Sequence, residues 1–291
     1  MNALVNSLND LPVWAFASLL GLLGLLLGSF LNVVIVRLPV MMEREERLFI
    51  AQATDQTPDH ELLGRYNLLT PASHCPQCRE PVRWWMNVPV LSYLALRGRC
   101  HGCKLGISVQ YPLVEIACAA AGLLAALYFG AGLKSIAVAG LLWALITLTV
   151  IDLNTQLLPD VITLPLLWAG LLFNLAGGLA PLSSAVWGAV AGYLSLWSVY
   201  QLFKLLTGKE GMGYGDFKLL AALGAWLGVG MILPIILFAS FTGALVGVSF
   251  IVLKRRDMSD KIPFGPYLAA GGAAALFYGE RVVDWYLGTL A

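Results

Sequence analysis

Two aspartates, Asp152 and Asp216, are the residues of this sequence best suited to catalysis. Each lies at the edge of an apolar stretch, where an ionisable side chain is costly and therefore indicates a function. Two carboxylates that share a proton can activate a water molecule. Asp216 also ends the glycine-rich run 211–216, in which Gly213 and Gly215 let the backbone approach another segment closely or take a positive φ. A flexible loop that ends in a capping aspartate is the alternative interpretation.

The two aspartates are expected at opposite ends of their helices. Asp152 closes an apolar segment, where the helix dipole disfavours a carboxylate, whereas Asp216 opens one, where the dipole favours the ionised form. Our hypothesis is that Asp216 is the ionised base that activates water. Asp152 would then hold the shared proton and donate it to a carbonyl group of the substrate.

Four cysteines form a second candidate site. They are Cys75 and Cys78 of one CxxC pair and Cys100 and Cys103 of another, with 21 residues between the pairs. Such knuckles each present two sulfurs to one tetrahedral zinc ion, and four protein ligands leave no open position, so the predicted zinc is structural. A metal also suits a polar segment with too few apolar residues for a core. Disulfides or redox-active thiols are the alternatives.

The elements that must position these residues are predicted to be membrane helices. Of 291 residues, 59% are hydrophobic and 12% are charged, against roughly 25% charged in soluble domains. The chain is therefore expected to be an all-α polytopic protein embedded in a lipid bilayer. Its net charge of +1, with no basic domain, argues against a nucleic-acid partner. Eight spans are predicted, at about 12–36, 112–131, 135–151, 158–177, 182–203, 216–230, 231–253 and 264–279.

The distribution of lysine and arginine predicts the orientation of these spans. The segment from Arg37 to Lys104 carries nine of the eighteen basic residues, and further clusters follow the fifth and seventh spans. Basic loops stay in the cytoplasm, so both termini are expected outside and both aspartates at the cytoplasmic edge. The predicted organisation is a first transmembrane helix in 1–39, a cytoplasmic zinc-binding insertion in 40–111 and a transmembrane core in 112–291.

Several other polar or aromatic residues near the spans allow two interpretations. Glu115 is either a first-turn glutamate favoured by the helix dipole or part of a polar pocket. Asp160 is typical of a helix start. Lys218 favours an interfacial anchor over a substrate contact. Asn32, inside the first span, is expected to face protein. Trp226 lies near a predicted span boundary and is expected to be an aromatic residue of the membrane–water interface.

The motifs around these residues resemble those of bacterial type IV prepilin peptidases, the bifunctional leader peptidase/N-methyltransferases of the GxGD aspartyl protease class. The resemblance covers nearly the whole chain and includes the two CxxC pairs. The other motifs that resemble those of the family are Gly28-Ser-Phe-Leu-Asn-Val-Val-Ile-Val-Arg-Leu-Pro39, Ile151-Asp-Leu-Asn-Thr-Gln-Leu-Leu-Pro-Asp160, Gly211-Met-Gly-Tyr-Gly-Asp-Phe-Lys218 and Pro263-Phe-Gly-Pro-Tyr267.

The resemblance implies a substrate and two reactions. Asp152 and Asp216 map to the catalytic aspartates of the family. Its members cut the basic leader of type IV prepilins and pseudopilins after a glycine, at the cytoplasmic face of the bacterial inner membrane. They then methylate the new terminal residue, usually Phe, with S-adenosylmethionine. The resemblance thus links the chain to pilus biogenesis and type II secretion. The cofactor-binding residues are not predicted, but the insertion is the expected place for the cofactor and for leader recognition.

Three alternative interpretations remain open at this level, and the last two belong to other classes of protein. A peptidase without methyltransferase activity would use only the chemistry of the two aspartates. A proton-coupled transporter could use the same aspartates as a relay, although transporters bind near the midplane and often show repeated halves, whereas these carboxylates are predicted at one edge. A zinc-containing assembly scaffold would need neither aspartate.

Overall fold

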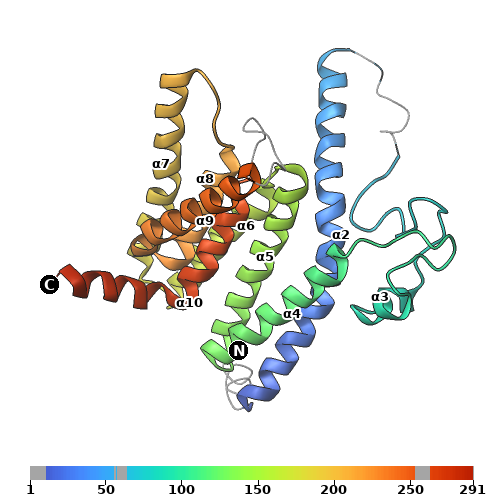
Figure 1. Cartoon of the computed structure of the whole chain (residues 1–291), viewed down its shortest axis with the longest axis horizontal. Helices are drawn as coiled ribbons and strands as arrows, with labels where there is room; N and C mark the ends of the chain where they lie inside the picture. Colours follow the sequence, from blue (N-terminus) through green and yellow to red (C-terminus); the bar gives the residue numbers. More distant parts are fainter. Residues whose placement is uncertain (1–10, 56, 58–63, 253–262, 291) are drawn as a thin grey trace. The chain divides into compact units, whose positions relative to one another are not determined.

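The computed structural model describes residues 11–55, 57, 64–252 and 263–290, and within these ranges the regular structure is helical (Figure 1). Two isolated β-bridges are the only strand-like pairings between the described residues. The helices are α2 (Val13–Ala53), α3 (Leu91–Ala95), α4 (Gln110–Phe129), α5 (Leu133–Thr155), α6 (Asp160–Leu175), α7 (Leu182–Thr207), α8 (Tyr214–Leu227), α9 (Ile232–Val252) and α10 (Gly265–Leu290), with short 3-10 turns η2 (Trp84–Asn87) and η3 (Val229–Met231).

The chain divides into two compact units, Met1–Thr147 and Leu148–Ala291. The division falls inside α5, so this helix contributes residues to both units. The first unit contains α2, α4 and the cysteine-bearing segment between them. The second contains Asp152, Asp216 and helices α6 to α10.

Small residues bring α2 and α4 into close contact in the first unit. A Cβ added at Gly28 of α2 would lie 2.8 Å from the Cα atom of Glu115 in α4, and one added at Gly24 would collide with the carbonyl of Cys118. The absence of side chains at these positions lets the two helices pack closely. Cys118 is fully buried, and its carbonyl accepts a 2.8 Å hydrogen bond from the indole N–H of Trp143.

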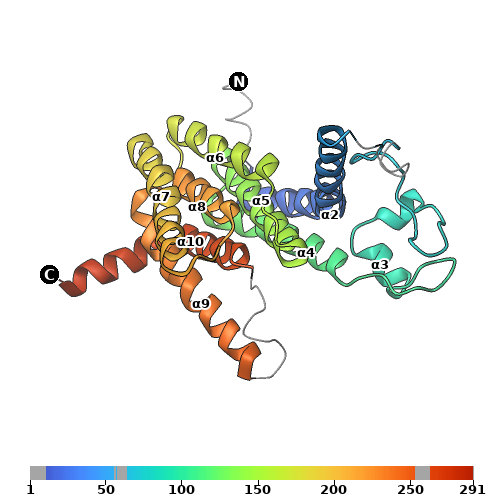
Figure 2. The same ribbon diagram turned by 90° about the horizontal axis from the view of Figure 1, so that it is seen from above.

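Helix α8 is the core of the second unit and contacts α6, α7 and α10 (Figure 2). From Leu219 to Trp226 every side chain of α8 is buried. A Cβ added at Gly192 of α7 would lie 2.6 Å from the carbonyl oxygen of Leu220 in α8, so backbone meets backbone along this interface. Trp226 is also buried and donates a 2.9 Å hydrogen bond to the Leu166 carbonyl of α6. The interfacial position predicted for Trp226 is therefore wrong.

Five of the described helices are long and apolar enough to cross a bilayer: α2, α4, α5, α7 and the segment Val229–Ser249. The chain is thus a helical membrane protein, whereas eight spans with both ends outside stay a prediction. Two of the eight predicted segments form shorter helices. At 1.5 Å per residue, the 14 residues of α8 extend about 21 Å, less than a hydrocarbon core of about 30 Å. Helix α2, by contrast, continues through Pro39 to Ala53, well beyond the predicted first span.

Candidate functional site

Asp152 lies near the C-terminal end of α5 and is only 4% exposed. Its Oδ2 atom accepts a 3.0 Å hydrogen bond from the backbone N–H of Gly265, the first residue of α10. The first N–H groups of a helix have no partner within it and carry the positive end of the dipole. Gly265, which is 113 positions away in sequence, therefore supplies the hydrogen-bond donor that the buried carboxylate of Asp152 requires.

Asp216 is the third residue of α8 and is also buried, at 7% exposure. Of the glycines that precede it, Gly215 has the closest neighbour, because an added Cβ would lie 2.6 Å from the Cβ atom of Leu158. Gly213 caps the helix with a φ of −81°, and its nearest neighbour, Asp216 Oδ2, lies 3.8 Å from an added Cβ. Close approach, and not positive φ, is thus the property that the structure requires at Gly215.

The two aspartates lie in one region of the second unit. Leu158 contacts the position of Gly215, next to Asp216, and its Cδ1 atom lies 3.1 Å from a Cβ added at Gly265, which binds Asp152. Two buried carboxylates in one region can share a proton and act as acid and base on a bound water.

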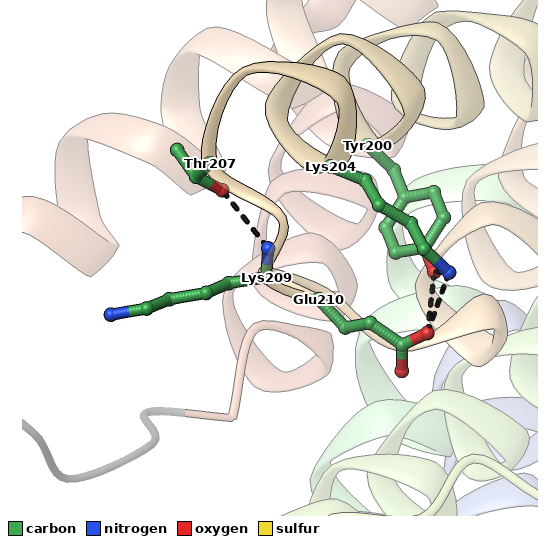
Figure 3. Close-up of polar contacts among 5 residues, drawn as sticks. All are labelled: Tyr200, Lys204, Thr207, Lys209 and Glu210. Atoms are coloured by element: carbon green, nitrogen blue, oxygen red, sulfur yellow. Dashed lines mark hydrogen bonds and ion pairs between the residues drawn. The ribbon is translucent and has the colours of Figure 1, made fainter.

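A polar network fixes the loop that leads to Asp216 (Figure 3). Glu210 Oε1 accepts hydrogen bonds from Lys204 Nζ at 2.8 Å and from the Tyr200 hydroxyl at 3.2 Å. The ring of Tyr200 in turn packs against Tyr214 and Phe217, with centroid distances of 5.3 and 5.6 Å. Helix α7 therefore holds the loop through the polar contacts of Glu210. It holds the start of α8 through the aromatic contacts of Tyr200.

Lys218 and Asp160 form an ion pair that the sequence did not reveal. Lys218 Nζ lies 2.7 Å from Oδ1 and 2.6 Å from Oδ2 of Asp160, the first residue of α6. The helix start predicted for Asp160 is confirmed, but its carboxylate also holds a partner from α8. Lys218 follows Asp216 by two residues, so the pair ties the beginning of α8 to the beginning of α6. Its role thus extends beyond the interfacial anchor favoured from the sequence.

The four cysteines predicted as metal ligands come together in the first unit. Their sulfur atoms all lie within 4.8 Å of one another, with Sγ–Sγ distances of 3.7 Å for Cys75–Cys103 and 3.8 Å for Cys78–Cys100. None of the four forms a disulfide. The backbone N–H groups of Cys78 and Gln77 lower the pKa of the Cys75 thiol to about 6, whereas burial and the neighbouring thiols raise the pKa of Cys78 to about 11. Four sulfur donors this close to one another fit zinc.

The histidines beside the cysteines make other contacts. His74 Nδ1 lies 2.8 Å from the carbonyl of Ala72, and His101 Nδ1 lies 3.5 Å from Glu80 Oε1. Neither histidine belongs to the cysteine cluster. The cluster is therefore complete with four sulfurs.

A cavity of about 680 Å³ lies between α2, α4 and the cysteine segment within the first unit. Asn32, Arg37 and Glu115 line it and are each less than 10% exposed. Arg37 donates to the carbonyls of Asn67 at 2.9 Å and Pro71 at 2.6 Å, so it holds the segment 67–71 in place. The structure therefore places Glu115 in a polar pocket, which decides between the two interpretations that the sequence left open. It also places Asn32 against protein, as the sequence predicted.

Two family models together match most of the chain. The first is the bacterial peptidase A24 N-terminal domain, over residues 22–129, and the second is the type IV leader peptidase family, over residues 139–248. The second match contains both aspartates, and the first contains the cysteines and the cavity.

Full-length relatives are named "Prepilin leader peptidase/N-methyltransferase". The relative from Aeromonas salmonicida strain A449 is 51% identical over 294 residues, covering all of both chains. The relative from Pseudomonas putida is 52% identical over 275 residues, 92% of both chains. The relative from Burkholderia pseudomallei strain 1026b is 53% identical over 258 residues, 88% of this chain and 84% of its own. No solved structure matches the chain.

Proposed function

Because the chain belongs to the type IV leader peptidase family, we propose that Asp152 and Asp216 cleave the leader peptide of type IV prepilins and pseudopilins. The chain is a prepilin leader peptidase and N-methyltransferase, and this membership disfavours the transporter and scaffold interpretations. The observation that carries the assignment of the two residues is their joint burial in the unit matched by the peptidase model.

The geometry supports hydrolysis by two carboxylates that share a proton. One carboxylate removes a proton from water, whose oxygen attacks the carbonyl carbon of the scissile bond, while the other protonates the carbonyl oxygen. The tetrahedral species then loses the amine of the following residue, and the C–N bond breaks with proton transfer to nitrogen. Asp152 keeps its orientation through the N–H of Gly265, and Asp216 keeps its orientation through the close packing of Gly215 on Leu158.

The location of the reaction follows from charge and burial. We place the scissile bond at the cytoplasmic face of the bacterial inner membrane, because the basic clusters of the sequence predict that side for both aspartates. A basic leader would remain in the cytoplasm while the apolar helix of the prepilin stays in the bilayer. Eight spans with both termini outside are part of this proposal.

Zinc is proposed as the metal of the cysteine cluster. Cys75, Cys78, Cys100 and Cys103 would hold it, and four thiolates leave no position for a reactant. Its contribution is to order the segment between α2 and α4, which has few buried side chains of its own. S-adenosylmethionine is the proposed methyl donor for the second reaction.

The decisive experiment is cleavage of a purified prepilin by the full-length protein in lipid. We expect Asp152→Asn and Asp216→Asn each to abolish cleavage, while Glu43→Gln, which alters an exposed carboxylate paired with Arg47, retains it. Methyl transfer is measured separately on an already cleaved pilin peptide with radiolabelled donor. Normal cleavage by both aspartate variants would refute the assignment, and cleavage without any methyl transfer would favour the peptidase-only alternative.

A further inference from the structure

The cavity of the first unit contains a buried polar atom without a partner. The side-chain nitrogen of Asn32 donates a 3.0 Å hydrogen bond to the carbonyl of Tyr111, but its Oδ1 atom accepts none from the described residues. Asn32 is 2% exposed and lines the cavity. An unsatisfied buried acceptor is costly, and it indicates a position that a donor on a ligand can fill.

Glu115 gives the cavity a second polar group, with a negative charge. Its Oε2 atom accepts a 2.8 Å hydrogen bond from the N–H of Val90. A carboxylate can accept about four hydrogen bonds, so this one leaves room for a ligand. Val90 has a φ of +59°, which is unusual for a β-branched residue and is a kind of strain that gathers at binding sites.

The remaining lining suits a ligand with both a cationic and an aromatic part. Apart from the cysteines and histidines, the charged residues of the lining are Arg37, Glu80 and Glu115, which leaves a formal charge of −1. Apolar walls from Val33, Met86 and other residues complete it. Its volume of about 680 Å³ lies within the range of about 300–1,000 Å³ typical of small-molecule sites.

We propose that this cavity is the binding site for S-adenosylmethionine, with Glu115 and Asn32 Oδ1 receiving the cationic methionine part. The proposal rests on the N-methyltransferase function proposed above. The donor carries a sulfonium and an ammonium group against one carboxylate, so its net positive charge complements the cavity. Its ammonium group can donate to the free Asn32 oxygen, and its adenosine group suits the apolar walls. When bound, it supplies the methyl group for the new amino terminus of the pilin.

The test measures binding in addition to activity. Full-length protein in detergent is titrated with S-adenosylmethionine and with S-adenosylhomocysteine, which lacks the sulfonium charge. Glu115→Gln retains an acceptor for the Val90 N–H but removes the charge. We expect it to weaken S-adenosylmethionine binding by roughly 10-fold or more and S-adenosylhomocysteine binding by less. A general loss of folding would weaken both ligands alike, so this difference separates the two causes.

A second variant closes the cavity from another side. Gly106 lines it, and a Cβ there would meet nothing within 4 Å, so Gly106→Trp can place its ring in the empty space. Gly64 has equally open surroundings but does not line the cavity, which makes Gly64→Trp the matched control. We expect Gly106→Trp to abolish binding of both ligands and Gly64→Trp to bind as the wild type does.

Three results would overturn the proposal. Unchanged binding of S-adenosylmethionine to both Glu115→Gln and Gly106→Trp would exclude the cavity as its site. Intact donor binding with weakened binding of a cleaved pilin peptide to Glu115→Gln would assign the cavity to the acceptor amine instead. A wild-type protein that neither binds S-adenosylmethionine nor methylates a pilin would remove the methyltransferase function itself, and that failure is visible without any variant.

Discussion

The backbone N–H of Gly265 donates a 3.0 Å hydrogen bond to Asp152 Oδ2, and no side chain separates the two residues. A Cβ added at Gly265 would lie 2.6 Å from the same oxygen. The absence of a side chain at position 265 is therefore a condition for this contact. The contact also bears on the proton-sharing hypothesis, because the N-terminal end of α10 offsets the unfavourable end of α5 at Asp152. The helix ends alone therefore no longer distinguish which aspartate is ionised.

Replacing Gly265 by alanine should disable leader cleavage. The added methyl group must displace the Asp152 carboxylate, and a displacement of about 1 Å in a reacting group reduces rates by about 100-fold. The measurement is the cleavage rate of a purified prepilin under saturating substrate. Gly230→Ala is the control, because its added Cβ meets nothing within 4 Å. Equal rates for the two variants would contradict a role for the Gly265 contact.

The two glycines before Asp216 should differ in their tolerance of a side chain. Gly215→Ala places a methyl group 2.6 Å from Leu158 Cβ, so the start of α8 must shift, and Asp216 with it. Gly213→Ala meets only Asp216 Oδ2 at 3.8 Å, in a backbone conformation that alanine accepts. We expect cleavage to fall about 100-fold in the first variant and far less in the second. A larger loss in Gly213→Ala would show that the glycine run acts through flexibility.

The Lys218–Asp160 ion pair should contribute a small, salt-sensitive coupling. The two side chains are 27% and 51% exposed, and such pairs are typically worth about 0.2–1 kcal/mol. Lys218→Met, Asp160→Asn and the double variant form a thermodynamic cycle for thermal unfolding and for cleavage. We expect the coupling to decrease as salt rises from low to physiological concentration. A coupling that does not respond to salt would contradict a solvent-exposed ion pair between Lys218 and Asp160.

Metal content should depend on four cysteines and not on the fifth. Serine at Cys75, Cys78, Cys100 or Cys103 removes one sulfur from the cluster and should lower bound zinc from one equivalent toward none. Cys118→Ala serves as the control, because Cys118 is buried between α2 and α4 and belongs to no cluster. Elemental analysis of the purified variants gives the stoichiometry. Full zinc in any of the four serine variants would show that its cysteine is not a ligand.

Loss of zinc should also expose the cysteine segment to proteolysis. The helices in the described part of the segment are the short η2 and α3, and neither contains a buried side chain, so we expect metal binding to be a main source of its order. Limited proteolysis with and without a chelator measures this effect. We expect methyl transfer to fall on chelation, because Cys75 and Cys100 line the proposed donor cavity.

Local spacing predicted the parts of this protein that depend on neighbours in sequence. The CxxC pairs were identified as ligands because each turn fixes two sulfurs, and the structure confirms that the four gather. The helical membrane character followed from composition and the length of the apolar runs.

Contacts between distant residues could not be predicted in this way. Gly265 meets Asp152 across 113 positions, Lys218 meets Asp160 across 58, and Asn32 meets Tyr111 across 79. Trp226 was misplaced because its position near a boundary is the same for a lipid-facing and a buried ring. In each case the outcome depends on which helix faces are brought together, and a single sequence does not specify that pairing.

The sequence by itself therefore determined that the chain is a helical membrane protein, and it predicted two carboxylates for acid–base chemistry and four sulfurs for a metal. Residue type and short-range spacing suffice for these, because they decide burial preference and ligand chemistry locally. Only the tertiary structure decided that α10 supplies the donor to Asp152 and that Leu158 lies beside both Gly215 and Gly265. It also decided that Asn32 and Glu115 face one cavity. These relations depend on close packing among distant helices, where the fit of small residues decides which polar atoms meet.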